Sequence, residues 1–389
     1  MIAARSAADR AEPIAGRRDR PPVHAGHCRR LLFVGTTRGE EGLVGHFTTL
    51  VVAMANAGHE IAAVVRPDGF AYHVLAMDGR IQVFPAPRDR GDVRVLRDVS
   101  RAARTTRPDW VVGTLEREHW PLTAISWGVG ARVALFSHRD QRSLTWAARS
   151  AALLAHRILA PSEYHRRRLV ERGMAADRVA MLHHPIDATR YRIEPRARAE
   201  ARHLLGFQPD DVVVGLVAPL ERESGVEPFG EVLRRAMTRD PAIRALWVGQ
   251  GECESRLRAC VGRWGHADRH VWRPWCADPL AHYAALDLLA LPAVGGEPSG
   301  RVLVEAQACG IPVLGSRIAG IPETMESGET GLLLSPGDVA EWTTALLRLA
   351  GDASERDRMG TVGREFVRRV FGARVVAADL GQLLDGVPR

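Results

Sequence analysis

Apolar runs of strand length alternate with helical segments along most of this chain, and this alternation restricts the folds open to it more than any other feature. The first series has apolar runs at residues 30–34, 61–65, 110–113 and 133–136, with helical periodicity near residues 44–57, 93–105 and 123–128. Strands joined through helices pair in parallel, because a parallel connection has to cross back over the sheet. The pattern therefore predicts an α/β protein with parallel sheets.

A second series of the same kind begins after a polar, arginine-rich stretch at residues 191–210. With 389 residues, 46% of them hydrophobic, the chain is too long for one core and has apolar material for two. We therefore expect a first domain at residues 30–190, a linker at residues 191–210 and a second domain at residues 211–370. Residues 1–29 are rich in Arg, Ala and Pro without periodicity, so a disordered extension is predicted there.

The net charge of +7 comes entirely from arginine, since the chain has no lysine. The absence of lysine, together with the single Asn56, indicates a GC-rich coding bias, so part of the arginine content carries no functional message. The remaining excess suits anionic partners. No aromatic-interleaved basic strand or zinc-finger spacing is present, and nucleic acid is therefore not expected as a partner.

The five cysteines are scattered and form no Cys-x-x-Cys pair, which predicts a reduced, cytoplasmic protein. No apolar run reaches the length of a membrane span, so any membrane contact is expected from the inner surface only. Arg139, Arg142 and the run at residues 166–168 are candidates for an anionic lipid or lipid-linked acceptor, and a solvated helix face is the alternative.

A loop rich in glycine joins an apolar run to a helix in the second domain. The run 286–291 stops at Pro292, and a helix is predicted from Arg301 to Gly310. The unpaired backbone amides of such a helix start favour a bound phosphate. Two carboxylates, Glu297 and Glu305, flank this position with seven residues between them, and from spacing alone each is also consistent with a solvated charge.

This loop and the segments after it, at residues 305–313, 319–323 and 328–333, resemble the Glu-x7-Glu region of retaining, GT-B fold glycosyltransferases of the large group 1 and family 4 type. The resemblance implies two Rossmann-like domains that face each other across a cleft. It also implies transfer of a sugar from a nucleotide-diphosphate sugar to a glycan, glycolipid or small-molecule acceptor, with retention of configuration. Neither a metal nor a cofactor is implied, and the oligomeric state is left open.

The resemblance also implies roles for individual residues. Glu297 is expected to reach the sugar hydroxyls, and Glu305 the ribose. The residues from Pro298 through Ser299, Gly300 and Arg301 to Val302 are expected to border the distal phosphate. The final segment, residues 371–389, is expected to return to the first domain as a helix.

Gly249 and Gly251 follow the apolar run 244–248 and are predicted to border the same donor. A Gly-x-Gly after a strand is also found in dinucleotide sites, but such a site needs an acid at the end of the next strand, where this chain has Arg273.

The phosphate-binding cations of the family are missing. The Arg and Lys that hold the diphosphate correspond here to Pro219 and Ser224. Arg222 lies between these positions and is the candidate substitute, because a guanidinium binds phosphate with two hydrogen bonds. Two hypotheses follow: an active transferase that uses Arg222, or a catalytically silent GT-B domain that acts as a binding or partner subunit.

Candidate cleft residues in the first domain match the family less well. Gly42 alone remains of the usual glycine pair, preceded by Glu41, so a ligand loop and a plain turn both stay open. His138 follows the run 133–136, where the family has a histidine that faces the donor sugar; a surface histidine is the alternative. The adjacent His183 and His184 have no further ligand at metal-binding spacing, so no metal site is predicted.

Overall fold

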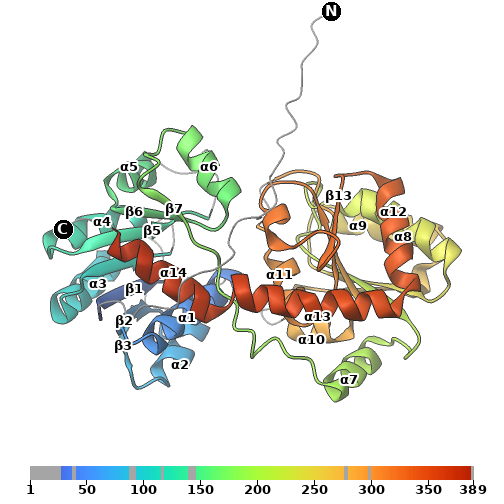
Figure 1. Cartoon of the computed structure of the whole chain (residues 1–389), viewed down its shortest axis with the longest axis horizontal. Helices are drawn as coiled ribbons and strands as arrows, with labels where there is room; N and C mark the ends of the chain where they lie inside the picture. Colours follow the sequence, from blue (N-terminus) through green and yellow to red (C-terminus); the bar gives the residue numbers. More distant parts are fainter. Residues whose placement is uncertain are drawn as a thin grey trace, which may run out of the picture.

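The computed structural model describes residues 28–36, 41–86, 93–114, 118–138, 146–275, 279–296 and 299–386. It has two α/β lobes joined by extended segments and by the C-terminal helices (Figure 1). Several predictions fall outside the described residues, namely those on Glu297 and Pro298 and on Arg139 and Arg142. The disordered extension predicted for residues 1–29 also lies almost wholly outside them.

The first lobe is a seven-stranded parallel sheet in the order β3-β2-β1-β4-β5-β6-β7. Its strands are β1 (Arg30–Gly35), β2 (Glu60–Val65), β3 (Ile81–Pro85), β4 (Trp110–Gly113), β5 (Arg132–Phe136), β6 (Arg157–Ala160) and β7 (Val179–Met181). The connecting helices are α1 (Glu41–Asn56), α2 (Phe70–Ala76), α3 (Val93–Thr106), α4 (His119–Gly128), α5 (Trp146–Leu154) and α6 (Glu163–Glu171).

Helices cover both faces of this sheet, which explains why its strands are apolar along their whole length. Leu31 and Phe33 of β1 belong to one core cluster, and Leu32 and Val34 belong to the cluster on the opposite face. Alternate residues of one strand thus enter two different cores.

The second lobe is a six-stranded parallel sheet in the order β10-β9-β8-β11-β12-β13. Its strands are β8 (Val212–Val217), β9 (Ile243–Val248), β10 (His270–Arg273), β11 (Leu288–Leu291), β12 (Val313–Ser316) and β13 (Gly331–Leu334). Around them lie α7 (Pro195–Leu205), α8 (Val226–Arg239), α9 (Glu254–Arg263), α10 (Leu280–Ala285), α11 (Arg301–Ala308), α12 (Val339–Gly351), α13 (Ala353–Val370) and the short helices η3 (Ala267–Arg269) and η4 (Ile321–Thr324).

Both sheets have the Rossmann strand order, so the prediction of two Rossmann-like parallel-sheet domains is confirmed. In each sheet the order reverses beside the first strand, between β1 and β4 and between β8 and β11. Ligands of open α/β sheets bind beyond the carboxyl ends of the strands at this reversal. The fold therefore points to two positions, one on each domain.

The C-terminal helices join the two lobes. Helix α13 lies along the second lobe, and α14 (Ala373–Asp385) lies on the first beside α1 (Figure 1). Val376 and Leu380 are buried in the same cluster as Leu31. Backbone hydrogen bonds fix the crossing point: Ile186 N donates to Phe371 O at 2.7 Å, and Ala373 N donates to Ile186 O at 3.1 Å.

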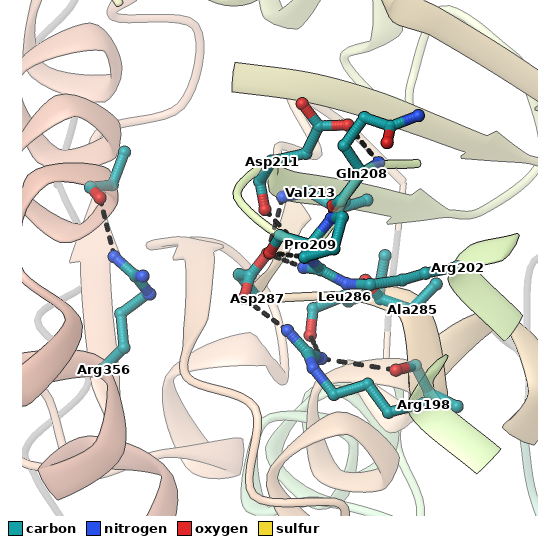
Figure 2. A network of polar contacts seen from close by, with 12 residues as sticks. Arg198, Arg202, Gln208, Pro209, Asp211, Val213, Ala285, Leu286, Asp287 and Arg356 are labelled. Atoms are coloured by element: carbon teal, nitrogen blue, oxygen red, sulfur yellow. Dashed lines mark hydrogen bonds and ion pairs between the residues drawn. The ribbon is translucent and has the colours of Figure 1, made fainter. Parts of the chain in front are cut away.

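A charged network attaches helix α7 to the second sheet (Figure 2). Asp287, just before β11, accepts hydrogen bonds from Arg198 Nη2 at 2.6 Å, from Val213 N at 2.7 Å and from the guanidinium of Arg202. Arg202 also donates to the carbonyl oxygens of Ala285, Gln208, Pro209 and Asp211. The residues predicted as a linker thus contain a helix that is fastened to the second domain.

No helix within the described ranges is both long enough and apolar enough to cross a membrane.

Candidate active site

Three loops of the second domain meet beyond the carboxyl ends of β8, β9 and β11. A Cβ on Gly225, whose φ is +70°, would lie 1.9 Å from Pro292 O, and one on Gly249 would lie 2.0 Å from Ala218 O. At Gly251, in the loop after β9, the added Cβ would lie 2.4 Å from Leu220 O in the loop after β8. Only glycine fits these contacts, so the surface at the reversal of strand order is lined by closely packed backbone.

Helix α11 begins at this surface with Gly300 as its N-cap, at φ +67°. A Cβ there would lie 2.7 Å from Thr324 Cγ2, so both the conformation and the space require glycine. The first amides of a helix have no partner within it and carry the positive end of its dipole. The predicted donor-binding residues Gly300, Arg301 and Val302 form this helix start, and Ser299 before them is exposed.

Glu305 lies one turn into α11 and is buried. Its Oε1 accepts a hydrogen bond from Arg301 Nε at 2.7 Å, and its Oε2 accepts one from Tyr283 Oη at 2.8 Å. Burial, and then the charge of Glu305, raise the pKa of Tyr283 and of Tyr191. Each carboxylate oxygen has a second lone pair, so this arrangement fixes the carboxylate while leaving it able to accept further hydrogen bonds.

The carboxyl edges of the two sheets face each other. A Cβ on Gly45 of α1 would lie 3.2 Å from Arg301 Nη2, so the guanidinium of the second domain packs against the first. Glu323 of η4, in the second domain, also contacts the first domain. Its carboxylate accepts hydrogen bonds from the backbone N–H groups of Glu163 and Tyr164, each at 2.7 Å. Glu323 thereby caps helix α6 of the other domain, and its burial raises its pKa.

Arg222, the candidate phosphate cation, lies on the turn between β8 and α8. Its side chain is 72% exposed, and its Nε lies 3.9 Å from Glu252 Oε1. The carbonyl oxygen of the neighbouring Glu223 accepts hydrogen bonds from Val294 N at 2.9 Å and Gly295 N at 3.2 Å. The turn that carries Arg222 therefore adjoins the loop that leads to α11, and the role of Arg222 stays a prediction.

Three histidines from distant parts of the sequence meet at the carboxyl edge of the first sheet. His184 Nε2 lies 3.2 Å from His138 Nδ1, and the ring centroids of His46 and His184 are 4.2 Å apart. His46 is fully buried, and neither of its ring nitrogens has a hydrogen-bond partner. His183, by contrast, lies with Nδ1 3.2 Å from Pro161 O. The residues near the His183–His184 pair in the sequence do not reveal this cluster, because His46 and His138 lie far from the pair along the chain.

Glu118 is a second group that the sequence patterns did not predict. Its Oε1 accepts the backbone N–H of Thr36 at 3.2 Å and also the Thr36 hydroxyl, and the carboxylate is buried. Thr36 follows β1, and Glu118 comes soon after β4, so the pair lies at the reversal of the first sheet. The available signal was an acid just after an apolar run. Glu41 and Gly42 begin α1 nearby, and only their backbone is described.

Comparison with family models gives two matches, which together cover most of both domains. Residues 211–352 match "Glycosyl transferases group 1", and residues 41–190 match "Glycosyltransferase Family 4".

Among individual relatives, 2-deoxystreptamine N-acetyl-D-glucosaminyltransferase of Streptomyces fradiae is 32% identical over 318 residues, 72% of this chain and 74% of that protein. A D-inositol 3-phosphate glycosyltransferase of Nocardia farcinica is 34% identical over 230 residues, 56% of this chain and 49% of that protein. The matched region spans about half the length of several such relatives.

Solved structures have the same architecture. Alr3699/HepE of Anabaena, in complex with UDP and glucose, superimposes with a TM-score of 0.74 at 20% identity, covering 92% of this chain and 100% of that one. A glycosyltransferase from Rickettsia africae ESF-5 superimposes with a TM-score of 0.77 at 13% identity, covering 92% of this chain and 98% of that one. At these identities the likeness concerns the fold alone.

Proposed function

Because the chain belongs to the GT-B glycosyltransferases of the group 1 and family 4 type, we propose that it transfers a sugar from a nucleotide-diphosphate sugar to an acceptor hydroxyl. One observation carries the proposal. The start of α11, bordered by glycine loops and by the fixed carboxylate of Glu305, lies at the strand reversal of the second sheet and faces the first domain.

The donor would lie on the second domain. Cleavage of the sugar–phosphate bond leaves additional negative charge on the distal phosphate, and the amides near Gly300 and Val302 are oriented to stabilise that charge without rearranging. Glu305 would accept hydrogen bonds from the ribose hydroxyls through its remaining lone pairs. In this proposal Glu297 contacts the hydroxyls of the transferred sugar, the reaction retains configuration, and it requires no metal.

Arg222 would replace the missing cations. Pro219 and Ser224 cannot balance the charge of a diphosphate, whereas Arg222 lies between them on the same turn, exposed and beside the loop before α11. A bidentate guanidinium contact to the distal phosphate would supply the charge.

The acceptor would lie on the first domain, near the strand reversal where Thr36 and Glu118 meet and near His138. The names of two relatives contain cyclitols, 2-deoxystreptamine and inositol 3-phosphate, which are both polyhydroxylated cyclohexanes. The 318-residue match exceeds the predicted length of either domain and so includes part of the acceptor side. These relatives support a small cyclitol or cyclitol glycoside as the acceptor class.

A second candidate function is a catalytically silent binding or partner subunit. The observation that favours it is the loss of both phosphate cations at Pro219 and Ser224.

A thermal-shift panel with UDP, GDP, ADP and dTDP tests the donor site. A nucleotide at a hundred times its dissociation constant adds about 2.7 kcal/mol to the free energy of unfolding. We expect one nucleotide to raise the melting temperature of the wild-type protein. The shift should be lost in Gly300→Ala and kept in Gly328→Ala, which also has a positive φ but has no atom within 4 Å of an added Cβ. No shift with any nucleotide would contradict the proposal.

A further inference from the structure

The three-histidine cluster, His46, His138 and His184, has the composition of a metal site and lies on the first domain, next to Arg301 of the second. Its members come from α1, from the end of β5 and from the segment after β7, all at one edge of the first sheet. One ring nitrogen from each lies within 4.8 Å of the other two. We propose that these imidazoles form a site for a divalent late transition metal such as Zn²⁺.

The hydrogen bonding of His46 supports a ligand. Both of its ring nitrogens are buried without a partner, and leaving a buried polar group unsatisfied costs about 1–3 kcal/mol. His46 packs against Phe136 and the other two histidines, with ring centroids 5.1 Å from Phe136 and 5.9 Å from His138. A metal ion would satisfy one nitrogen of His46 and replace the contact between His138 and His184.

The geometry requires a small contraction. Zinc binds histidine nitrogen at about 2.0–2.1 Å, so three nitrogens at a tetrahedral zinc lie about 3.4 Å apart. His184 Nε2 and His138 Nδ1 are already 3.2 Å apart. His46 therefore has to move toward that pair, and it has no hydrogen bond to break when its ring turns. Three protein ligands leave the fourth position of the metal open.

The type of ligand and the nearby charge are compatible with a cation. Metals bind the neutral form of imidazole. Arg301 faces His46 and His184, but its charge is offset by Glu305 at 2.7 Å. Imidazole ligands without carboxylates favour Zn²⁺, Cu²⁺ or Ni²⁺ over Mg²⁺ and Ca²⁺.

The test is a Co²⁺ titration of the untagged, chelator-treated protein followed by visible absorption, with Zn²⁺ added afterwards as a competitor. We expect one Co²⁺ per chain with the intense bands of tetrahedral nitrogen coordination, displaced by Zn²⁺. His138→Gln and His184→Gln should each weaken binding at least about tenfold. The matched control is His183→Gln, which changes the adjacent histidine outside the cluster and should bind as the wild-type protein does.

Circular dichroism of each variant shows whether it is folded. Three results would overturn the proposal: no Co²⁺ spectrum in the wild-type protein, equal affinity in a folded His138→Gln or His184→Gln, or thiolate-to-cobalt absorption that assigns the metal to a cysteine. The wild-type spectrum decides the question even where a variant fails to fold.

Discussion

Two buried polar clusters of this protein differ in how completely their hydrogen bonds are satisfied. At the amino end of β11, Asp287 binds two arginines and a backbone amide, and Arg202 also donates to four carbonyl oxygens (Figure 2). At the carboxyl edge of the first sheet, His46 is fully buried but has no hydrogen-bond partner for either nitrogen.

This difference distinguishes a cluster that stabilises the fold from one that is able to bind a ligand. The Asp287 network uses its hydrogen-bonding capacity to hold α7 on the second sheet, and nothing in it calls for a ligand. The histidine cluster lies where ligands of open α/β sheets bind, and it retains unused capacity. The two ends of β11 in the second domain differ in the same way. At the amino end, two arginines form ion pairs with Asp287, whereas the carboxyl end leads to the first amides of α11, which have no partner within the helix.

Asp287→Asn should have the largest effect. The substitution leaves Arg202 and Arg198 without their counter-charge, and breaking a buried ion pair costs about 3–5 kcal/mol of the free energy of unfolding. Urea denaturation measures this loss. The control is Glu231→Gln, which breaks half-exposed ion pairs with Arg234 and Arg235 and should cost less than about 1 kcal/mol. Equal losses in the two variants would contradict a structural role for the network.

Acid should destabilise the protein partly through His270, a buried histidine whose Nδ1 accepts a hydrogen bond from Trp247 Nε1 at 3.0 Å. Burial, and then His266, lower its pKa to about 4, although Asp268 opposes the shift. Below about pH 6.5 the unfolded chain takes up a proton that the folded chain does not. The stabilisation is therefore complete above pH 6.5 and decreases as pH falls to about 4, by about 3 kcal/mol in total.

His270→Gln keeps an acceptor for Trp247 but removes the titration. Urea denaturation at about pH 7 and about pH 4.5 should show a smaller acid-dependent loss in this variant than in the wild-type protein. The same pH dependence in both proteins would mean that His270 does not titrate as described.

Arg222→Ala should lower sugar transfer at least about tenfold, equivalent to about 1.4 kcal/mol of transition-state stabilisation. Because the side chain is 72% exposed, the melting temperature should not change. Steady-state kinetics check the rate, and Arg256→Ala, at another exposed arginine of the second domain, serves as the control. An unchanged rate would rule out Arg222 as the phosphate cation.

His46→Leu should have the smallest effect on stability and the opposite sign. Removing an unsatisfied buried imidazole should leave the free energy of unfolding unchanged or raise it by up to about 1 kcal/mol. The matched substitution His270→Leu deprives Trp247 Nε1 of its acceptor and should cost about 1–2 kcal/mol. Denaturation curves compare the two, and a large loss in His46→Leu would show that His46 has a packing role.

The sequence predicted the parallel sheets and the start of α11 because these depend on local patterns. Strands buried on both faces are continuous apolar runs, such as residues 212–217. The start of the helix after Gly300 is determined by the residues of the loop that precedes it. Helix α2 (Phe70–Ala76) has only seven residues, about two turns, and this short pattern gave no prediction.

The rest of the site depends on contacts between distant segments. The pairing of Arg301 with Glu305 follows helix spacing, but its position against Gly45 requires the two domains to be placed together. His46, His138 and His184 meet only because three connections end at the same edge of the sheet. Sequence spacing cannot show this, and the adjacent His183, which looked like a partner for His184, lies elsewhere.

The most direct measurement is product formation by the purified chain in the presence of EDTA, with the nucleotide sugar whose nucleotide gives a thermal shift and a panel of cyclitol acceptors. Mass spectrometry detects the glycoside, and NMR gives its anomeric configuration. We expect acceptor-dependent release of the nucleoside diphosphate and a glycoside of retained configuration. Nucleotide binding without transfer to any acceptor would contradict it and would favour the catalytically silent subunit.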